Sequence, residues 1–213
     1  MERIVLIGGG GHCAVVLDAV RAGESFQPVG FVDVAERADS DVLGLPFVGT
    51  EADLPRLAAE GATGFIVTVG STGDASLRER LHGAAVEAGL EPVTVLHPSA
   101  VISDSARVGR GTFVAALAHV GPRSVVGEGA IVNTHASVDH DCDVAPFVHM
   151  APGAVLSGGV TVGQCAHIGA AAVVSHGVSV GERAVVGTGA VVVRDVPAGA
   201  VVYGNPARER REV

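Results

Sequence analysis

Residues 126–162 read VGEGAI VNTHAS VDHDCD VAPFVH MAPGAV LSGGVT V, and this stretch decides the fold. Every sixth residue is aliphatic, and the residue four positions after each of these is small or β-branched. A six-residue period of this kind is typical of a parallel β-helix, in which three hexads make one triangular coil. The aliphatic residue fills the axis of the prism, and only a small residue fits near the corner. We therefore expect residues three hexads apart to stack directly on one another.

The period extends in both directions from this stretch. Its aliphatic positions are Leu96, Ile102, Val108, Val114, Val120, Val126, Val132, Val138, Val144, Met150, Leu156, Val162, Ile168, Val174, Val180, Val186 and Val192. The 30 glycines, the 3 % aromatic residues and the absence of Trp agree with a narrow core of small residues. We predict that residues 96–213 form a β-helix domain with a short C-terminal tail.

The first 95 residues alternate strand and helix signals instead. Apolar runs predict strands over residues 4–7, 29–34, 64–69 and 93–96. Helical spacing of apolar residues predicts helices over residues 15–20, 54–58 and 77–88. This alternation indicates an α/β domain with a small parallel sheet, similar to half of a dinucleotide-binding (Rossmann) fold.

Composition excludes several classes of function. A net charge of −9 provides no basic stripe that would displace counterions from nucleic acid, so we expect no nucleic-acid partner. No apolar run reaches the length of a membrane span, and the first residues lack the features of a signal peptide. We therefore expect a cytoplasmic protein without membrane insertion. Cys13, Cys142 and Cys165 have unrelated spacings, which favours buried thiols over a disulfide framework or a metal clip.

A run of four glycines, residues 8–11, follows the first predicted strand. It matches GxG, but Cys13 replaces the third glycine of a dinucleotide-binding GxGxxG motif. The amino terminus of the helix after His12 is suited to receive a diphosphate. Asp33, about 20 residues further on, is placed to bind a ribose, as in an NAD-dependent oxidoreductase. Fewer than 100 residues precede the repeat, so a half-site for one nucleotide fits better than a complete dinucleotide domain.

His140 lies between two aspartates, Asp139 and Asp141, at a position of its hexad that faces a turn. Flanking carboxylates favour the imidazolium and can orient the ring, as a general base requires. The residues alone also allow a solvated turn histidine. Gly158 stands three hexads after His140 and should lie one coil above it. It fits either a turn glycine or a backbone N–H that holds an oxyanion.

The other histidines of the repeat give weaker signals. His149 and His167 are three hexads apart and should stack, but one prism supplies no third ligand for zinc, so we expect no metal. His135 and His176 are expected on the surface or along a groove. Five arginines at the far end fit either coenzyme A phosphates or a solubilising tail: Arg183, Arg194, Arg208, Arg210 and Arg211.

Five segments together resemble a known family. They are IGGGGH (7–12), VVLD (15–18), FVD (31–33), NTHASVDHDC (133–142) and YGNPAR (203–208). With the hexad repeat, they make the chain similar to the hexapeptide-repeat acyltransferases, within the subfamily of sialic-acid O-acetyltransferases and nucleotide-sugar N-acetyltransferases. The bacillosamine and perosamine N-acetyltransferases belong to this subfamily. The resemblance implies a left-handed β-helix and a homotrimer with active sites between subunits.

The resemblance also implies roles for individual residues. His140 falls on the catalytic base and Asp141 on its acidic partner, which is often Glu in the family. The Gly158 amide would meet the oxyanion, and His149 would lie near the acceptor and the acetyl group. Residues implied to bind the nucleotide sugar are Gly8, Gly10, Gly11, His12, Asp33, Asn133 and His149. Residues implied to contact acetyl-CoA are His149, Gly158, Gly169, Ala170 and Arg208.

The activity implied by the resemblance is direct transfer of an acetyl group from acetyl-CoA to the amine of a nucleotide-activated amino sugar. An acyl-enzyme is not expected, because Cys142 should point into the packed axis. Four alternatives stay open at this stage: an O-acetyltransferase acting on a sialic acid or related hydroxyl, an acyl-carrier protein as donor in place of acetyl-CoA, a non-catalytic solenoid scaffold, and the dinucleotide-dependent oxidoreductase.

Overall fold

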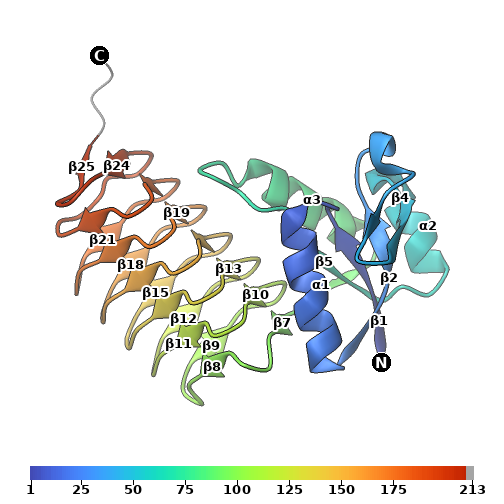
Figure 1. Ribbon diagram of the computed structural model, residues 1–213, viewed down its shortest axis with the longest axis horizontal. Helices are drawn as coiled ribbons and strands as arrows, with labels where there is room; N and C mark the ends of the chain where they lie inside the picture. The colour runs from blue at the N-terminus through green and yellow to red at the C-terminus, as the bar shows by residue number, and fades with distance from the viewer. Residues whose placement is uncertain (210–213) are drawn as a thin grey trace.

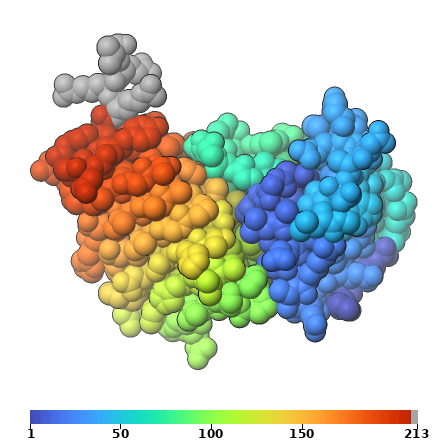
Figure 2. All heavy atoms as spheres, viewed as in Figure 1, coloured from blue at the N-terminus to red at the C-terminus, as the bar shows by residue number. Residues whose placement is uncertain are grey.

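The computed structural model describes residues 1–209, and its chain forms two parts in contact (Figure 1). The first part is a six-stranded sheet with helices on both faces. The second is a prism of short stacked strands that begins at Val95. Figure 2 shows the two parts in contact, with the last coils (orange to red) projecting away from the N-terminal part. Within residues 1–209, none of the helices is long and apolar enough to cross a membrane.

The first part contains a small, mostly parallel sheet with the strand order β3-β4-β2-β1-β5-β6. The predicted α/β fold is therefore confirmed. Its elements are β1 (Glu2–Ile7), α1 (Gly11–Gly23), β2 (Phe26–Val32), η1 (Ala35–Arg37), β3 (Asp41–Val42), β4 (Leu45–Gly49), η2 (Glu51–Asp53), α2 (Leu54–Ala59), β5 (Gly64–Val67), α3 (Ser76–Glu87) and β6 (Glu91–Pro92). The antiparallel pair β3 and β4 at the edge is not among the predicted strands, because its apolar signal in the sequence is too short. The strand predicted over 93–96 is wrong, since Glu91–Pro92 closes this sheet and Val95–Leu96 begins the prism.

The second part has three faces, each a sheet of stacked strands. The first face contains β7 (Val95–Leu96), β10 (Phe113–Val114), β13 (Ile131–Val132), β16 (His149–Met150), β19 (His167–Ile168), β22 (Val185–Val186), β24 (Val201–Tyr203) and β25 (Arg208–Glu209). The second face contains β8 (Val101–Ile102), β11 (His119–Val120), β14 (Ser137–Val138), β17 (Val155–Leu156), β20 (Val173–Val174) and β23 (Val191–Val192). The third contains β9 (Arg107–Val108), β12 (Val125–Val126), β15 (Asp143–Val144), β18 (Thr161–Val162) and β21 (Ser179–Val180). This is the β-helix that the hexads predict, and it has the left-handed form that the resemblance implies.

Stacking follows the predicted spacing of three hexads. Ile131 pairs with His149, and His149 pairs with His167, so that the aliphatic residues next to them fill the axis. Leu96 was expected in the axis, but its side chain is 43 % exposed because no coil lies beneath it. The last coil is shorter than the others. Val185 pairs with Val201, whereas in a full coil of three hexads its partner would be Tyr203.

The junction between the two parts is built on α1. Leu17 and Val20 of this helix share an apolar cluster with Phe113 and Ile131 of the first face. Helical spacing places one side of α1 on its own sheet and the adjacent side on the prism (Figure 1). The first face of the β-helix is therefore the one that faces the N-terminal part.

Close stacking of the coils makes a glycine substitution in the prism a direct test of the fold. A Cβ at Gly127 would lie 2.5 Å from the backbone nitrogen of Pro146 in the next coil. We expect Gly127→Ala to lower the free energy of unfolding by about 1–3 kcal/mol. Gly83→Ala is the matched control, because a Cβ at Gly83 in α3 meets nothing within 4 Å. Thermal unfolding at equal protein concentration measures both, and an unchanged melting temperature of Gly127→Ala would contradict this packing.

Candidate active site

The glycine loop, residues 8–11, connects β1 to α1. Two side chains that follow the neighbouring strand β2 hold it by hydrogen bonds. Asp33 follows β2, and its Oδ2 accepts the N–H of Gly9 at 2.6 Å. Arg37 donates from Nη1 to the Gly9 carbonyl at 2.9 Å, and its Nε lies 3.5 Å from Asp33 Oδ2. Asp33 Oδ1 accepts the N–H of Val34 at 2.7 Å. Asp33, which the resemblance implies to bind the nucleotide sugar, therefore also fixes the loop.

An open cleft of about 410 Å³ lies beside this loop. It is lined by Gly8, Gly10, Gly11, His12, Asp33, Arg37, Thr68, Val69, Gly70 and Leu77. A Cβ at Gly10 or Gly11 would meet nothing within 4 Å, so the cleft has room for a ligand here. Helix α1 begins at Gly11, one residue before His12 rather than after it, with Gly10 as its N-cap. Gly11 and His12, the first residues of α1, line this cleft, and helix amino termini are suited to bind phosphate groups.

His12 packs against the prism. Its ring lies 5.5 Å from the ring of Phe113 in an edge-to-face contact. Its Nε2 is buried and finds no hydrogen-bond partner among residues 1–209. Burial, aided by the charge of Arg78, lowers the pKa of His12 to about 4, so the ring is neutral at pH 7. The ring thus closes the cleft on the side of the β-helix.

His149 lies on the first face, 7 % exposed, next to the loop that precedes α3. Its Nδ1 donates to the carbonyl of Ser71 at 2.6 Å, which leaves Nε2 as an acceptor. Asn133 Nδ2 lies 3.4 Å from that Nε2. Burial lowers the pKa of His149 to about 3. The structure therefore brings together Asn133, His149 and, at 6.4 Å between ring centroids, His12.

His167 stacks on His149 one coil further on, as predicted, with 5.0 Å between ring centroids. Its Nδ1 is buried and has no hydrogen-bond partner within the described part of the chain. Burial also lowers the pKa of His167. Among residues 1–209, no group of three or more His, Cys, Asp or Glu side chains is arranged to hold a metal ion.

Arg78 is the residue of this region that sequence analysis missed. It lies on α3, is 2 % exposed, and donates from Nη2 to the carbonyls of Gly129 and Phe147 at 2.7 and 2.8 Å. Its Nη1 donates to Ser71 Oγ at 3.2 Å, in the residue whose carbonyl holds His149. A charged helix residue is ordinarily expected in solvent, and only the prism packed on α3 makes this one buried. Arg78 fixes the loop before α3 to two turns of the prism.

His140 lies at the corner between the second and third faces. Its side chain is 47 % exposed, and its Nδ1 lies 2.7 Å from Asp141 Oδ2. Arg123, one coil below, holds both oxygens of Asp141 at 2.6 and 2.7 Å. These two partners hold the pKa of Asp141 well below its usual range. Asp139 has a different role, since its Oδ1 accepts the backbone N–H of His140.

Gly158 lies directly above the His140 ring. A Cβ at this position would be 2.5 Å from His140 Nε2, so only glycine allows the ring to lie here. Its N–H donates no hydrogen bond to the described residues. The turn function belongs to Gly159, which has a φ of +70°. The close approach and the free N–H therefore coincide at Gly158, next to Nε2.

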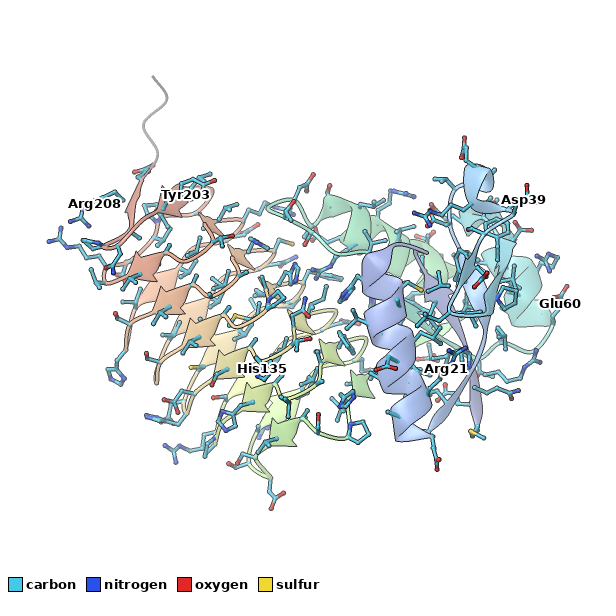
Figure 3. All side chains as sticks on the ribbon, in the orientation of Figure 1. Arg21, Asp39, Glu60, His135, Tyr203 and Arg208 are labelled. Carbon is cyan, nitrogen blue, oxygen red and sulfur yellow. The ribbon has the colours of Figure 1, made fainter. Side chains whose placement is uncertain are left out.

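The remaining candidates fall in different places. Cys142 is buried in the axis, and burial raises its pKa, as expected for an inert thiol. Gly169 is buried between coils beside Ala170, whereas Arg208 is exposed at the far end of the prism (Figure 3). Arg183 is paired with Glu79 of α3 at 2.9 Å, which accounts for its charge without a ligand. Arg194, His135 and His176 are exposed. Arg210 and Arg211 lie outside the described residues.

Buried neutral histidines predict a specific acid sensitivity. The pKa of His149 is about 3 in the folded chain and near 6.5 when unfolded. Between these values the unfolded chain binds the additional proton, so the free energy of unfolding falls as the pH decreases below about 6.5. Each such histidine contributes a slope of up to about 1.4 kcal/mol per pH unit. Chemical denaturation from pH 7 to 4.5 should show a smaller slope for His149→Gln and an unchanged slope for exposed His176→Gln. Equal slopes in both variants would contradict the burial of His149.

Comparisons with known proteins show which family the chain resembles in sequence and fold. The family model of the PglD N-terminal domain matches residues 3–84. A histidine-to-alanine mutant of GDP-perosamine N-acetyltransferase from Caulobacter crescentus, in complex with CoA and GDP-perosamine, is 39 % identical with a TM-score of 0.94. The alignment covers 100 % of this chain and 98 % of that one. A comparison with curated proteins gives no significant match.

Two other solved structures have the same fold over their whole length. The acetyltransferase domain of PglB from Neisseria gonorrhoeae, in complex with acetyl coenzyme A, is 37 % identical with a TM-score of 0.91. The alignment covers 98 % of this chain and 99 % of that one. WeeI from Acinetobacter baumannii is 26 % identical with a TM-score of 0.86, over 99 % of this chain and 100 % of that one. The family expected from the five sequence segments is confirmed: the chain belongs to the hexapeptide-repeat nucleotide-sugar N-acetyltransferases.

Proposed function

We propose that this chain transfers the acetyl group of acetyl-CoA to the amine of a nucleotide-activated amino sugar. The observation that carries the proposal is the His140–Asp141 pair beside the free N–H of Gly158. The relatives support the two substrates, since their structures contain CoA with GDP-perosamine or acetyl coenzyme A. The glycine-loop cleft supports the nucleotide, because it offers a helix amino terminus in an open space.

The chemistry requires a base, an oxyanion donor and a route for one proton. The sugar amine attacks the thioester carbonyl carbon, and His140 Nε2 removes a proton from the attacking nitrogen. The Gly158 N–H stabilises the oxyanion of the tetrahedral intermediate. The C–S bond then breaks, and the proton passes from His140 to the leaving thiolate. The products are the acetamido sugar and CoA with a free thiol, without an acyl-enzyme.

Asp141 and Arg123 prepare His140 for this role. Asp141 accepts a hydrogen bond from the Nδ1–H group of His140, which leaves Nε2 as the ring nitrogen that acts as the base. The two hydrogen bonds from Arg123 keep Asp141 ionised and fix its orientation. Aspartate is shorter than the glutamate that the family often has at this position. Asp141 still reaches the His140 ring, because it is adjacent in sequence and its Oδ2 lies 2.7 Å from Nδ1.

The remaining binding roles follow the same arrangement. In this proposal Gly8, Gly10, Gly11 and His12 receive the diphosphate, and Asp33 holds their loop at the border of the nucleotide site. Asn133 and His149 contact the sugar and the acetyl group from the first face. Backbone groups of Gly169 and Ala170 lie along the pantetheine arm, and Arg208 is available to the phosphates of CoA.

The position of His140 further supports a homotrimer with sites shared between subunits. His140 lies at the corner between the second and third faces, whereas the glycine loop and His149 lie on the side of the first face. Asp141, Gly158 and His176, which lie beside the His140 side chain, belong to the prism. One chain therefore places its base and its nucleotide cleft on different sides. We propose that His140 of one subunit serves the nucleotide cleft of its neighbour.

Removal of the base tests the reaction. We expect His140→Ala to lower kcat for thiol release from acetyl-CoA by at least about a hundredfold, with 4-amino nucleotide sugars as acceptors. His97→Ala is the control: it removes an imidazole at the start of the prism, outside the proposed site, and should retain activity. Full activity of His140→Ala would overturn the mechanism. Turnover only with sialic-acid acceptors would indicate O-acetylation, and the absence of both thiol release and CoA binding would favour a scaffold.

Mixed oligomers test the shared site. Gly10→Glu places a negative charge in the open cleft and should abolish nucleotide-sugar binding without a steric clash. Each single variant, Gly10→Glu or His140→Ala, should be inactive alone. Unfolding and refolding the two together should restore activity, because some interfaces then combine an intact cleft with an intact His140. A mixture that stays inactive although the subunits exchange would show that each site uses one chain only.

A further inference from the structure

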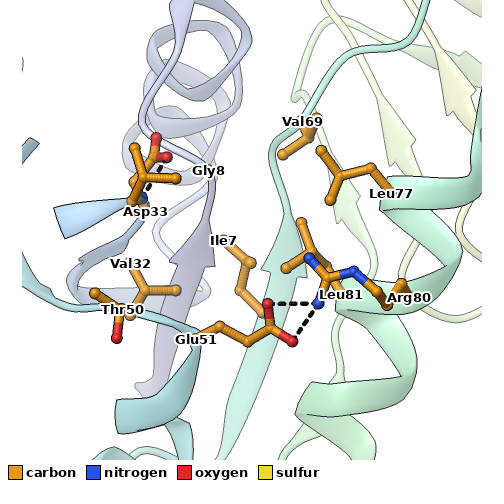
Figure 4. Close-up of a pocket in the computed structure, with 11 residues that line it drawn as sticks. Ile7, Gly8, Val32, Asp33, Thr50, Glu51, Val69, Leu77, Arg80 and Leu81 are labelled. Atoms are coloured by element: carbon orange, nitrogen blue, oxygen red, sulfur yellow. Dashed lines mark hydrogen bonds and ion pairs between the residues drawn. The ribbon is translucent and has the colours of Figure 1, made fainter. Parts of the chain in front are cut away.

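A second, smaller pocket adjoins the glycine-loop cleft. The two share Gly8, Asp33, Val69 and Leu77 as a common border. The pocket has a volume of about 220 Å³ and is completed by Ile7, Val32, Val34, Thr50, Glu51, Arg80 and Leu81 (Figure 4). A ligand whose diphosphate lies at the helix amino terminus would therefore extend directly into it. The volume is below that of a typical pocket for a complete ligand and suits one part of a ligand.

The walls of this pocket are mainly aliphatic. Ile7, Val32, Val69, Leu77 and Leu81 provide flat apolar surfaces suited to the faces of an aromatic ring. An apolar slot that continues a diphosphate site matches the two adjacent parts of a nucleoside diphosphate. The inference that follows depends on the proposed function, because it concerns the nucleotide of that substrate.

The polar groups of the pocket are concentrated in one ion pair. Glu51, at the start of η2, and Arg80, on α3, meet across the pocket, away from Gly8 and Asp33 in the view of Figure 4. Arg80 Nη1 lies 2.5 and 2.6 Å from the two carboxylate oxygens. The Nε and Nη2 groups of Arg80 donate to no other residue within 1–209. An exposed ion pair of this kind adds little to the stability of the fold. Its position at the pocket therefore points to a role in ligand binding.

The two charged groups offer acceptors and donors next to each other. A carboxylate accepts two parallel N–H groups, and guanine presents such a pair on one edge, at N1 and N2. Guanine also places the O6 acceptor beside N1, within reach of a guanidinium. Uracil and thymine offer one N–H between two carbonyl oxygens, which would repel one carboxylate oxygen. Adenine offers no ring N–H on this edge.

We propose that the nucleotide of the substrate is a guanosine diphosphate, and that Glu51 recognises the N1–H and N2–H groups of the base while Arg80 donates to O6. Asp33, whose two oxygens hold the Gly9 and Val34 amides, fixes the loop between base and diphosphate. Base specificity then resides in the contact between η2 and α3, outside the β-helix.

Calorimetric titration with GDP, IDP, UDP and ADP tests this assignment on the full chain. IDP differs from GDP only by the missing 2-amino group. We expect GDP to bind at least about tenfold more tightly than IDP, since a hydrogen bond to a charged group is worth about 1.5–3 kcal/mol. In Glu51→Gln this ratio should approach one. The matched control is Glu60→Gln, which removes the carboxylate of another surface ion pair, with Arg56, and should retain the ratio.

Each other outcome overturns the assignment in a distinct way. Equal affinity for all four nucleotides would show that only the diphosphate is recognised, and tightest binding of UDP would assign a pyrimidine. A GDP preference that persists in Glu51→Gln would exclude this carboxylate. Arg80→Met is a second variant, for which we expect weaker GDP binding with the GDP-to-IDP ratio retained. Thiol release from acetyl-CoA with a GDP-linked amino sugar is measured separately: its absence, with GDP preference intact, would refute the proposed function and leave the base assignment standing.

Discussion

The packing of one aliphatic residue per hexad along the prism axis is the constraint on which the rest of the structure depends. Because each coil must bury these residues against the coil below, the chain keeps a three-hexad register from Val95 to Val192. Side chains at the corners then stack at fixed intervals. Arg123, Asp141 and His140 meet in this way, and Gly158 receives the His140 ring one coil above. The geometry of the proposed catalytic residues is thus a consequence of coil stacking, on a rigid scaffold.

The first face of the prism has a second function, as the support of the N-terminal part. Helix α1 covers its beginning, and Arg78 of α3 reaches into its turns at Gly129 and Phe147. The loop before α3 is thereby held against His149, and the Ser71 carbonyl selects the tautomer in which Nε2 accepts. Burial, aided by the charge of Arg78, lowers the pKa of His12, His149 and His167. The exposed Asp141 differs, because its hydrogen bonds to Arg123 and His140 lower its pKa and favour the charged form.

The nucleotide side of the site follows a different principle. Parallel strands end at one edge of the sheet, so Gly8, Asp33 and Val69 converge there although they are far apart in the sequence. The apolar pocket and the glycine-loop cleft share this edge, and charged residues from η2 and α3 complete it. The proposed catalytic residues and the proposed nucleotide site therefore belong to two architectures, joined in one chain through the first face.

The sequence by itself determined the β-helix, its register, the positions of α1, α2 and α3, and the candidate residues His140, Asp141 and Gly158. The strict period carries the β-helix and its register, because every coil repeats the same packing requirement. The helices follow from the helical spacing of apolar residues, and the three candidate residues follow from the resemblance. It did not determine that Arg78 is buried, that Arg123 holds Asp141, that Arg183 pairs with Glu79, or that Glu51 meets Arg80. Each of these contacts joins side chains from different elements or coils, and a charged residue looks solvent-exposed until its partner is placed. Only the tertiary structure decided them, because the distance between two side chains depends on how their elements pack.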